Sequence, residues 1–297
     1  MALRGGLPTE DGYVGVEGVR LVEEALRSGC PIRAVLFGES GERHHERLAS
    51  LIDRPEMAFP VLRTTDRLFE GLADTEHPQG VAALVKPREA SFDDLVRTPS
   101  TACAPLLAIL AGVQDPGNVG TILRTAAAFG ATSAATAASG TSGTANPFSP
   151  KALRASAGAA LHLPVLAGMS LSILLAQLKV AGVRTLASSV HGAEVVGARF
   201  NASPPLAPWE VDWCQPVALL VGNEGAGLPE EVERSADARI RIPMSGGVES
   251  LNAAAAAAVV FYEVARQRNS FQASNIQESV ASQPPKTPDT VQPPEKT

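Results

Sequence analysis

The segment QDPGNVGTILRTAAAFGA, residues 114 to 131, places a single cation inside a helix that follows a polar loop. The loop holds Asp, Pro, Gly and Asn, and the helix behind it holds small and apolar residues apart from Arg124. A guanidinium stays protonated at physiological pH, so it can stabilise negative charge but makes an unlikely base. Because the loop follows the strand PLLAIL, at the end where open α/β sheets bind ligands, the segment predicts a ligand-binding position. The alternative is an exposed helix arginine paired with a carboxylate.

A second polar loop lies in LLVGNEGAGLPEEV, residues 219 to 232, directly after an apolar run typical of a buried strand. The loop contains three glycines and one carboxylate, Glu224. Glycines at the end of a strand allow a ligand to approach the backbone closely. Pro229 then predicts the first position of a helix. For this loop taken alone, a plain strand-to-helix turn with an exposed glutamate is the alternative.

The third polar segment lies in IRIPMSGGVESLNAAAAAAVVFYEVARQR, residues 240 to 268. A strand ends before Pro243, and a helix is entered through Ser250 and Asn252, which could simply be helix caps. The alanine run 253–258 favours a helix and allows close packing against another segment or a second subunit. Capping does not explain why polar loops follow three strands of one predicted sheet, at the edge where open α/β sheets bind ligands.

Several familiar chemistries are excluded by missing motifs. The sequence has no GxxxxGK[ST] loop, GNEGAG lacks the spacing of GxGxxG, and no GxSxG elbow is present. Three cysteines lie far apart without CxxC spacing, and the five histidines show no metal-ligand pattern. We therefore expect reduced thiols, no metal site and a cytoplasmic protein. No run of about 18 apolar residues predicts a membrane span, and the N-terminus has no signal-peptide pattern.

The elements that must position these loops alternate between strand-like and helix-like runs, which predicts an α/β fold with two domains. Residues 12–86 predict a small α/β domain, and 87–104 a polar, proline-rich linker. Residues 105–268 predict a larger domain with a mostly parallel sheet covered on both faces. Its predicted strands are PLLAIL, RTLASSV, PVALLVG and ARIRI, and its helices start near Val119, Pro150, Leu171, Pro229 and Leu251. Residues 269–297 hold few large apolar groups and are expected to be disordered.

Charge is distributed unevenly along the chain, whose formal net charge is -6. Residues 1–100 hold 12 Lys or Arg and 17 Asp or Glu. The chain has no overall excess of positive charge of the kind that is typical of nucleic-acid-binding proteins. On composition alone, this counts against RNA binding.

Helical geometry separates Arg124 from the apolar side of its own helix. At 100° per residue, Val119, Ile122, Leu123 and Ala126 form one apolar stripe, and Arg124 falls beside Gly120, Thr121 and Ala128. Small neighbours predict open space over this face, and helical side chains lean toward the N-terminus. We therefore expect Arg124 to point back over the loop Asp115–Asn118.

Three segments in this order resemble the motifs of the SpoU (TrmH-like) RNA 2′-O-ribose methyltransferases, in the SPOUT superfamily. They are DPGNVGTILRTAAAFGA, LLVGNEGAGLP and IPMSGGVESLNAAAAAAVVFYE. SPKALRASAGAALHLPV, residues 149 to 165, is similar to the segment between the first two motifs. EGVRLVEEAL and TEHPQGVAALV resemble the family's N-terminal RNA-binding domain. The resemblance covers roughly residues 13–268.

The resemblance implies a small N-terminal α/β (L30e-like) RNA-binding domain and a C-terminal α/β domain that closes a trefoil knot, an exception to the rule against knots. It also implies a homodimer and S-adenosylmethionine as the cofactor. Backbone at Gly222, Ile242 and Leu251, helped by Ser188 or a neighbour, is expected to hold that cofactor. The catalytic residues implied by the motifs are Asn118, Arg124, Glu224, Ser250 and Asn252. The acceptor implied is a ribose 2′-hydroxyl.

The resemblance leaves three substrate hypotheses. Ribose methylation of 23S ribosomal RNA is favoured because the N-terminal domain resembles the ribosomal branch, and this chain lacks the short basic extensions of tRNA-specific relatives. A tRNA ribose methyltransferase is the first alternative. The second is a catalytically inactive ribosome-assembly protein, against which the intact motif residues argue. One segment departs from the family: TSAATAASGTSGTANPF is more polar than the strand expected there, which predicts weak pairing near residue 135.

Overall fold

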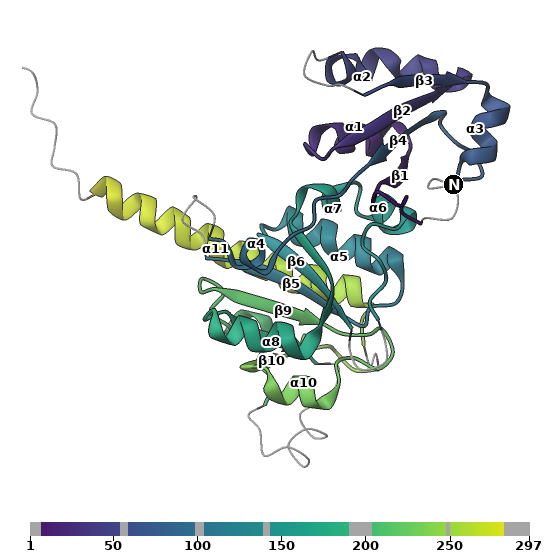
Figure 1. Cartoon of the computed structure of the whole chain (residues 1–297). Helices are drawn as coiled ribbons and strands as arrows, with labels where there is room; N and C mark the ends of the chain where they lie inside the picture. The colour runs from purple at the N-terminus through teal and green to yellow at the C-terminus, as the bar shows by residue number, and fades with distance from the viewer. Residues whose placement is uncertain are drawn as a thin grey trace, which may run out of the picture.

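The computed structural model describes residues 7–53, 59–98, 104–138, 143–189, 204–247 and 250–281, and side chains of the last helix as far as residue 269. The chain forms two α/β units, with the N-terminal unit seated on the C-terminal one (Figure 1). This agrees with the predicted fold class. No helix among the described residues is long and apolar enough to cross a membrane.

The N-terminal unit is a four-stranded sheet with helices beside it. The strand order is β1-β4-β2-β3, with β2 and β3 parallel and the other two pairings antiparallel. The apolar runs AVLFG and GVAALV in the sequence predict two strands, which correspond to β2 and β4, whereas no local pattern predicts β1, β3 or the helix α3. The elements are β1 Val14–Glu17, α1 Val19–Arg27, β2 Ile32–Gly38, η1 Glu39–His44, α2 His45–Ile52, β3 Val61–Thr64, α3 Asp66–Leu72 and β4 Val81–Val85.

The C-terminal unit is built on a parallel sheet, as predicted, and this sheet has six strands where the sequence patterns indicated four. The strand order is β10-β8-β9-β5-β6-β7, so the chain returns to the centre when β9 pairs with β5. The carboxyl ends of β5 and β9 therefore lie side by side, and their loops share one edge of the sheet. The strands are β5 Leu106–Ala111, β6 Ser133–Ala138, β7 Val165–Ser170, β8 Arg184–Ser188, β9 Val217–Val221 and β10 Ala238–Ile240.

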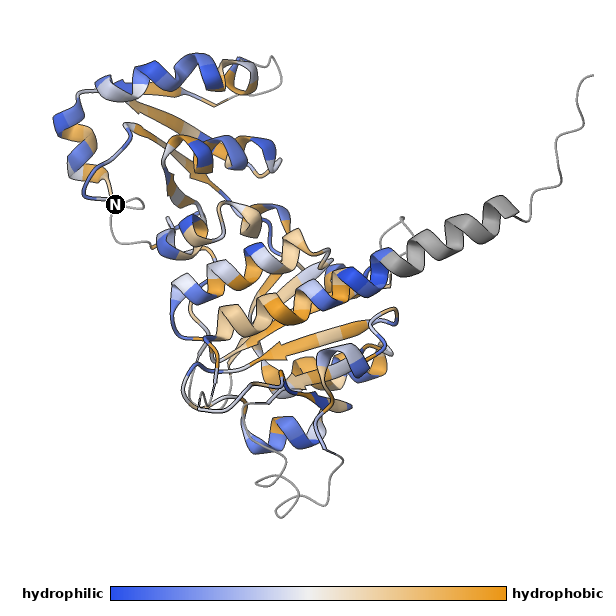
Figure 2. Cartoon of the chain, turned by 180° about the vertical axis from the view of Figure 1, so that it is seen from behind, coloured by the Kyte–Doolittle hydropathy of each residue, from blue (hydrophilic) through white to orange (hydrophobic). Residues whose placement is uncertain are grey.

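Helices cover both faces of this sheet, because its strands are apolar on both sides. One face packs against α5 and α11, and its core continues into the N-terminal unit. The other face packs against α4, α8 and α10. Figure 2 shows the apolar strands between the helices of the two faces. The helices are α4 Phe92–Val96, α5 Pro116–Ala128, α6 Pro150–Ala155, α7 Ala159–His162, α8 Leu171–Val180, η2 Pro208–Glu210, α10 Glu230–Ser235 and α11 Ala253–Ala281.

The prediction of weak pairing near residue 135 holds on one side of the strand only: β6 pairs without interruption with β5, whereas its register with β7 shifts between Ala135 and Ala137. Strand β6 is buried over most of its length and pairs in parallel with β5 on one side and β7 on the other. Alanine dominates β6, and small side chains let the covering helices approach an interior strand closely. Thr144 secures its end, because its Oγ1 donates to the carbonyl of Ala137 at 2.7 Å and accepts from the amide of Gly112 at 2.8 Å.

Two segments predicted to be irregular contain helix. The predicted linker includes α4, which begins with a capping box between Ser91 and Asp94 and buries Leu95 fully against the C-terminal sheet. Helix α11 continues to Ala281, past the predicted end near Arg268. Residues 269–281 contain neither Gly nor Pro, so nothing in the local sequence stops the helix there. The remaining predicted tail, 282–297, lies outside the described residues.

Candidate functional site

The candidate site begins at the start of α5, where Asp115 caps the helix. Its Oδ1 accepts a hydrogen bond from the backbone amide of Gly117 at 3.0 Å, and Pro116 occupies the first turn. The helix therefore begins three residues before Val119, its predicted start. This early start places Asn118 in the first turn, at the carboxyl edge of the sheet.

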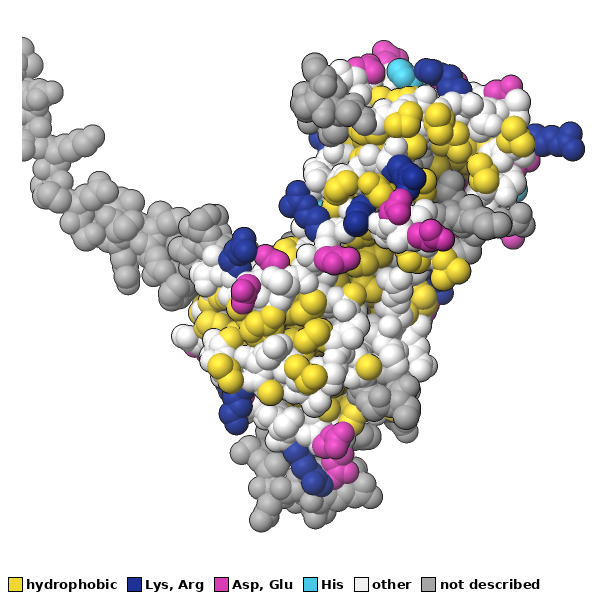
Figure 3. Space-filling view, in the orientation of Figure 1, with side chains coloured by type: hydrophobic (Ala, Val, Ile, Leu, Met, Phe, Trp, Pro, Cys, Tyr) yellow, Lys and Arg dark blue, Asp and Glu magenta, His cyan; other side chains and the backbone are white. Residues whose placement is uncertain are grey.

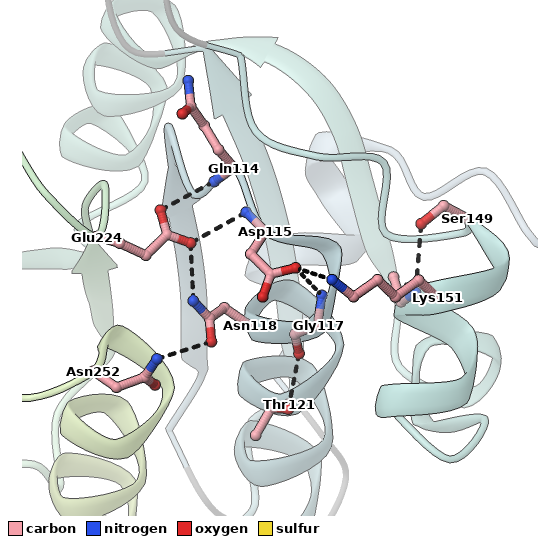
Figure 4. Close-up of polar contacts among 10 residues, drawn as sticks. Gln114, Asp115, Gly117, Asn118, Thr121, Ser149, Lys151, Glu224 and Asn252 are labelled. Atoms are coloured by element: carbon pink, nitrogen blue, oxygen red, sulfur yellow. Dashed lines mark hydrogen bonds and ion pairs between the residues drawn. The ribbon is translucent and has the colours of Figure 1, made fainter.

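Glu224 joins the loop after β9 to the loop after β5. Its Oε1 accepts hydrogen bonds from Asn118 Nδ2 at 3.0 Å and from the backbone amide of Asp115 at 3.2 Å. Its Oε2 accepts from the backbone amide of Gln114 at 3.2 Å. Figure 4 shows the carboxylate between these donors. One side chain thereby holds together two segments that are more than a hundred residues apart in the sequence.

Asn252 connects the third loop to the same network. Its Nδ2 donates to Asn118 Oδ1 at 3.1 Å, while its Oδ1 accepts from the backbone amides of Ala254 at 2.9 Å and Ala255 at 3.3 Å. Asn252 therefore caps α11 and also contacts Asn118, so its capping role is compatible with the role in the site that the resemblance implies. Helix α11 begins after it, two residues later than Leu251, its predicted start.

Glu224 is a carboxylate whose acceptor positions are already in use. Burial alone raises the pKa of Glu224. Hydrogen bonds from the Asn118 side chain and from the backbone amides of Glu224, Gln114 and Asp115 lower it by more than burial raises it, so the pKa lies below its ordinary 4.5. At neutral pH the group is thus ionised, and its lone pairs accept bonds from the neighbouring loop. This arrangement suits an orienting residue better than a general base.

Gly222 and Asn223 shape the loop that presents Glu224. A Cβ at Gly222 would lie 2.4 Å from the carbonyl carbon of Gly227 and 2.5 Å from the amide nitrogen of Leu228. The expected space for a ligand beside Gly222 is thus filled by the loop itself. Asn223, which the sequence analysis missed, donates from Nδ2 to the carbonyl of Gly112 at 2.9 Å. An Asn followed two residues later by Gly is the local sequence signal of a turn that the Asn side chain stabilises.

An apolar pocket lies next to this network and collects most of the expected cofactor residues. It comprises about 540 Å³ of empty space, part of which is open solvent. Ser188, Ile242, Ser250 and Leu251 line it, together with apolar residues of β9 and α11. No hydrogen bond joins the Ser250 side chain to a described residue. Gly222 is outside the lining, but Val221 before it belongs to the lining.

Arg124 is not brought together with the other predicted catalytic residues. It is exposed on α5 and makes no hydrogen bond or ion pair with any residue in the described part of the chain. It lies almost two helical turns beyond Gly117, on the side of α5 that adjoins α6. The open space expected beside it is occupied at Gly120, where a Cβ would lie 2.2 Å from the carbonyl oxygen of Ala152. The small residue there permits close packing of α5 against α6.

Lys151 at the start of α6 is a further residue that the sequence analysis missed. Its Nζ lies 2.6 Å from Asp115 Oδ1 (Figure 4). Hydrogen bonds from the Lys151 side chain and from the backbone amide of Gly117 hold the pKa of Asp115 below its ordinary value. No group of three or more His, Cys, Asp or Glu side chains in the described ranges is arranged to hold a metal ion.

Two family profiles match the chain over the two units. The profile of the SpoU rRNA methylase family matches residues 105–262. The profile of the RNA 2′-O ribose methyltransferase substrate-binding domain matches residues 16–91. The first covers the parallel sheet with its three polar loops, and the second covers the N-terminal sheet.

Curated relatives align over most of the chain. A tRNA/rRNA methyltransferase of Mycolicibacterium vanbaalenii is 33% identical over 254 residues, which are 84% of this chain and 75% of the relative. A TrmH-family tRNA/rRNA methyltransferase of Staphylococcus haemolyticus is 32% identical over 256 residues, which are 86% of this chain and 96% of the relative.

Solved structures with similar folds come from the same group of enzymes. The SpoU methyltransferase AviRb of Streptomyces viridochromogenes, in complex with AdoMet, superposes with a TM-score of 0.71 at 26% identity, over 88% of this chain and 92% of that one. An AdoMet-bound rRNA methyltransferase of Sinorhizobium meliloti gives 0.70 at 28% identity, over 86% and 88%. The chain belongs to the SpoU rRNA methylase family and is an RNA methyltransferase.

Proposed function

We propose that this enzyme transfers a methyl group from S-adenosylmethionine to the 2′-oxygen of a ribose in RNA, with 23S ribosomal RNA as the substrate. The observation that carries the proposal is the network of Asn118, Glu224 and Asn252 beside an apolar pocket at the carboxyl edge of the sheet. The loops that form it contain no aromatic residue that could stack a flipped base. Small polar groups and a carboxylate suit a sugar hydroxyl.

The pocket fits the cofactor by the chemistry of its lining. Apolar side chains of β9 and α11 would pack against the adenosine, and Ser188, Ser189 and Ser250 offer hydroxyls at the pocket edge. Backbone at Ile242 and Leu251 would contact the remaining parts. When bound, S-adenosylmethionine supplies an electrophilic methyl group on a sulfonium. Because Ser250 and Leu251 line the pocket and Asn252 enters the polar network, the same short segment would set the methyl group beside the acceptor.

The polar residues of the site would bind and orient the RNA substrate. Glu224 fixes Asn118 through a charge-assisted hydrogen bond, and Asn118 would orient the ribose hydroxyl. Arg124 lies on another side of α5 than Asn118 and has no protein partner among the described residues. Its long side chain would turn toward the ribose when RNA binds, and its guanidinium would then stabilise the alkoxide that develops as the proton leaves. Ser250 lines the pocket and is adjacent in sequence to Leu251 and Asn252, so its hydroxyl would hold the sugar.

Ribosomal RNA is preferred to tRNA because the N-terminal unit supplies a second, separate surface for a large folded substrate. The similar AdoMet-bound enzyme of Sinorhizobium meliloti is an rRNA methyltransferase. The relatives of Mycolicibacterium vanbaalenii and Staphylococcus haemolyticus carry names that include both substrates. Mapping of ribose methylation in ribosomal and transfer RNA from a deletion strain separates the two.

A single 2′-deoxy substitution tests the acceptor atom. An RNA fragment with deoxyribose at the target nucleotide alone should accept no methyl group, whereas its all-ribose twin should be labelled from radioactive cofactor. The physical reason is that the deoxy sugar lacks the nucleophile and keeps the base unchanged. Equal labelling of both fragments would place the methyl group on the base and refute the ribose assignment.

We also propose that the enzyme is a homodimer whose C-terminal segment is threaded into a trefoil knot. Support for the dimer comes from an exposed apolar stripe on α11 formed by Ala255, Val259 and Tyr262, which recur at helical spacing. The side chains of Val259 and Tyr262 are 43% and 58% exposed, which is unusual for residues of a helix that otherwise packs on the core. Sedimentation equilibrium should return twice the chain mass of 30.8 kDa; a monomer mass would contradict the proposal.

A further inference from the structure

Helix α6 lies between the N-terminal unit and the catalytic loops. On one side it packs closely on α5, where the Ala152 carbonyl covers Gly120. On the other side it packs against β1, and Arg154 forms an ion pair with Asp74 of the N-terminal unit. Figure 1 shows α6 between β1 and α5. An RNA that contacts the N-terminal unit and also reaches Asn118 therefore passes α6.

Two basic side chains of α6, Lys151 and Arg154, form ion pairs toward the catalytic loop and toward the N-terminal unit, respectively. Lys151 Nζ lies 2.6 Å from Asp115 Oδ1 in the catalytic loop, and Arg154 Nη1 lies 2.9 Å from Asp74 Oδ2. The two residues are three positions apart, so they lie on neighbouring turns of one helical face. The side chain of Lys151 is 61% exposed and that of Arg154 is 35% exposed. Both cations are thus accessible and already extended toward the surface that RNA would cover.

The energetics of these ion pairs permit an exchange of partners. Exposed ion pairs contribute only about 0–1 kcal/mol each, because water screens the charges. A phosphate offers a strong acceptor for a lysine and a bidentate acceptor for an arginine. Figure 3 shows basic and acidic side chains next to one another where the two units meet. The acidic partners therefore hold the cations in place at low cost and do not compete strongly with an RNA backbone.

We propose that Lys151 and Arg154 form a phosphate-binding strip that guides the RNA backbone from the N-terminal unit to the catalytic loop. Asp115 and Asp74 orient the two cations when RNA is absent. The proposal rests on RNA as the substrate of this site, but it does not depend on which atom is methylated. It also accounts for RNA binding by a chain without an overall basic field, because the cations are concentrated on the path of the substrate.

The test measures RNA binding against salt for the double variant Lys151→Gln, Arg154→Gln. A fluorescein-labelled RNA hairpin of arbitrary sequence is the probe, because phosphate contacts do not depend on sequence. Each lost contact should reduce the slope of log affinity against log salt by about 0.7–0.9, so the double variant should lose about 1.4–1.8. Affinity for S-adenosylmethionine, measured by calorimetry on the same protein, should stay within about twofold of wild type, because neither residue lines the pocket.

The matched control is Lys179→Gln, Arg234→Gln, which removes the same charges from exposed positions of α8 and α10 on the other face of the sheet. Its salt slope should equal that of wild type. Lys151→Arg should retain the slope, and Asp115→Asn should not weaken RNA binding, because asparagine still caps α5. The proposal is overturned if the α6 variant keeps the wild-type slope, if the control loses as much, or if Asp115→Asn reproduces the loss. The last outcome would make Lys151 a positioning residue of the loop.

Discussion

Replacing Arg124 with alanine should lower the rate of methyl transfer by about 100-fold or more, the usual effect of losing one group that stabilises transition-state charge. The affinity for S-adenosylmethionine should stay nearly unchanged, because Arg124 does not line the pocket. Protein stability should also be unchanged, because the side chain is exposed and makes no hydrogen bond or ion pair with a described residue. Single-turnover transfer to RNA, calorimetric cofactor binding and thermal unfolding measure the three quantities.

Two further variants sharpen this prediction. Arg124→Lys should recover only part of the rate, because an ammonium keeps the charge but not the planar fork of the guanidinium. Arg234→Ala, an exposed arginine of α10 on the opposite face of the sheet, should transfer methyl groups at the wild-type rate. A near wild-type rate for Arg124→Ala would make Arg124 an ordinary surface residue. A fall in cofactor affinity of the same size would place it in the cofactor site instead.

Replacing Gly222 with alanine should weaken binding of S-adenosylmethionine by about fivefold or more, since overpacking of this kind costs roughly 1–3 kcal/mol. The added Cβ would lie 2.4 Å from the backbone of Gly227, so the loop that carries Glu224 must move. Val221, which lines the pocket, is the adjacent residue and would shift with it. Transfer should fall further than binding, because the hydrogen bonds that Glu224 accepts from the loop after β5 would be broken. Calorimetry and single-turnover transfer give the two values.

Gly225→Ala is the matched control in the same loop. A Cβ at Gly225 would have its nearest neighbour at 3.6 Å, an ordinary contact with Asn223 Oδ1. The control should therefore bind the cofactor as tightly as wild type. Equal binding by both variants would show that the tight packing at Gly222 does not support the pocket, whereas equal losses would indicate a general sensitivity of the loop.

The sequence alone determined the parts whose signals are local. The apolar stripe of α5 is buried as predicted, with Val119, Ile122, Leu123 and Ala126 each fully buried. The predicted strands of the parallel sheet correspond to β5, β8, β9 and β10. They could be predicted because a short apolar run bounded by turn residues indicates a buried strand without information from the rest of the chain. Errors occurred where local signals mislead: β6 is rich in small residues, and α4 lies in a polar stretch with three prolines nearby.

Only the tertiary structure decided which motif residues meet. Asn118 and Asn252 contact each other, and Glu224 joins them, while Arg124 lies on another side of α5 although it is six residues from Asn118. The sequence also could not show that Gly120 serves the packing of α6. The physical reason is that these contacts depend on the order of strands in the sheet. The pairing of β9 with β5 brings two of the loops together, and the segment between β10 and α11 contributes Asn252 to them. Strand order follows from the packing of the whole chain, which no local pattern encodes.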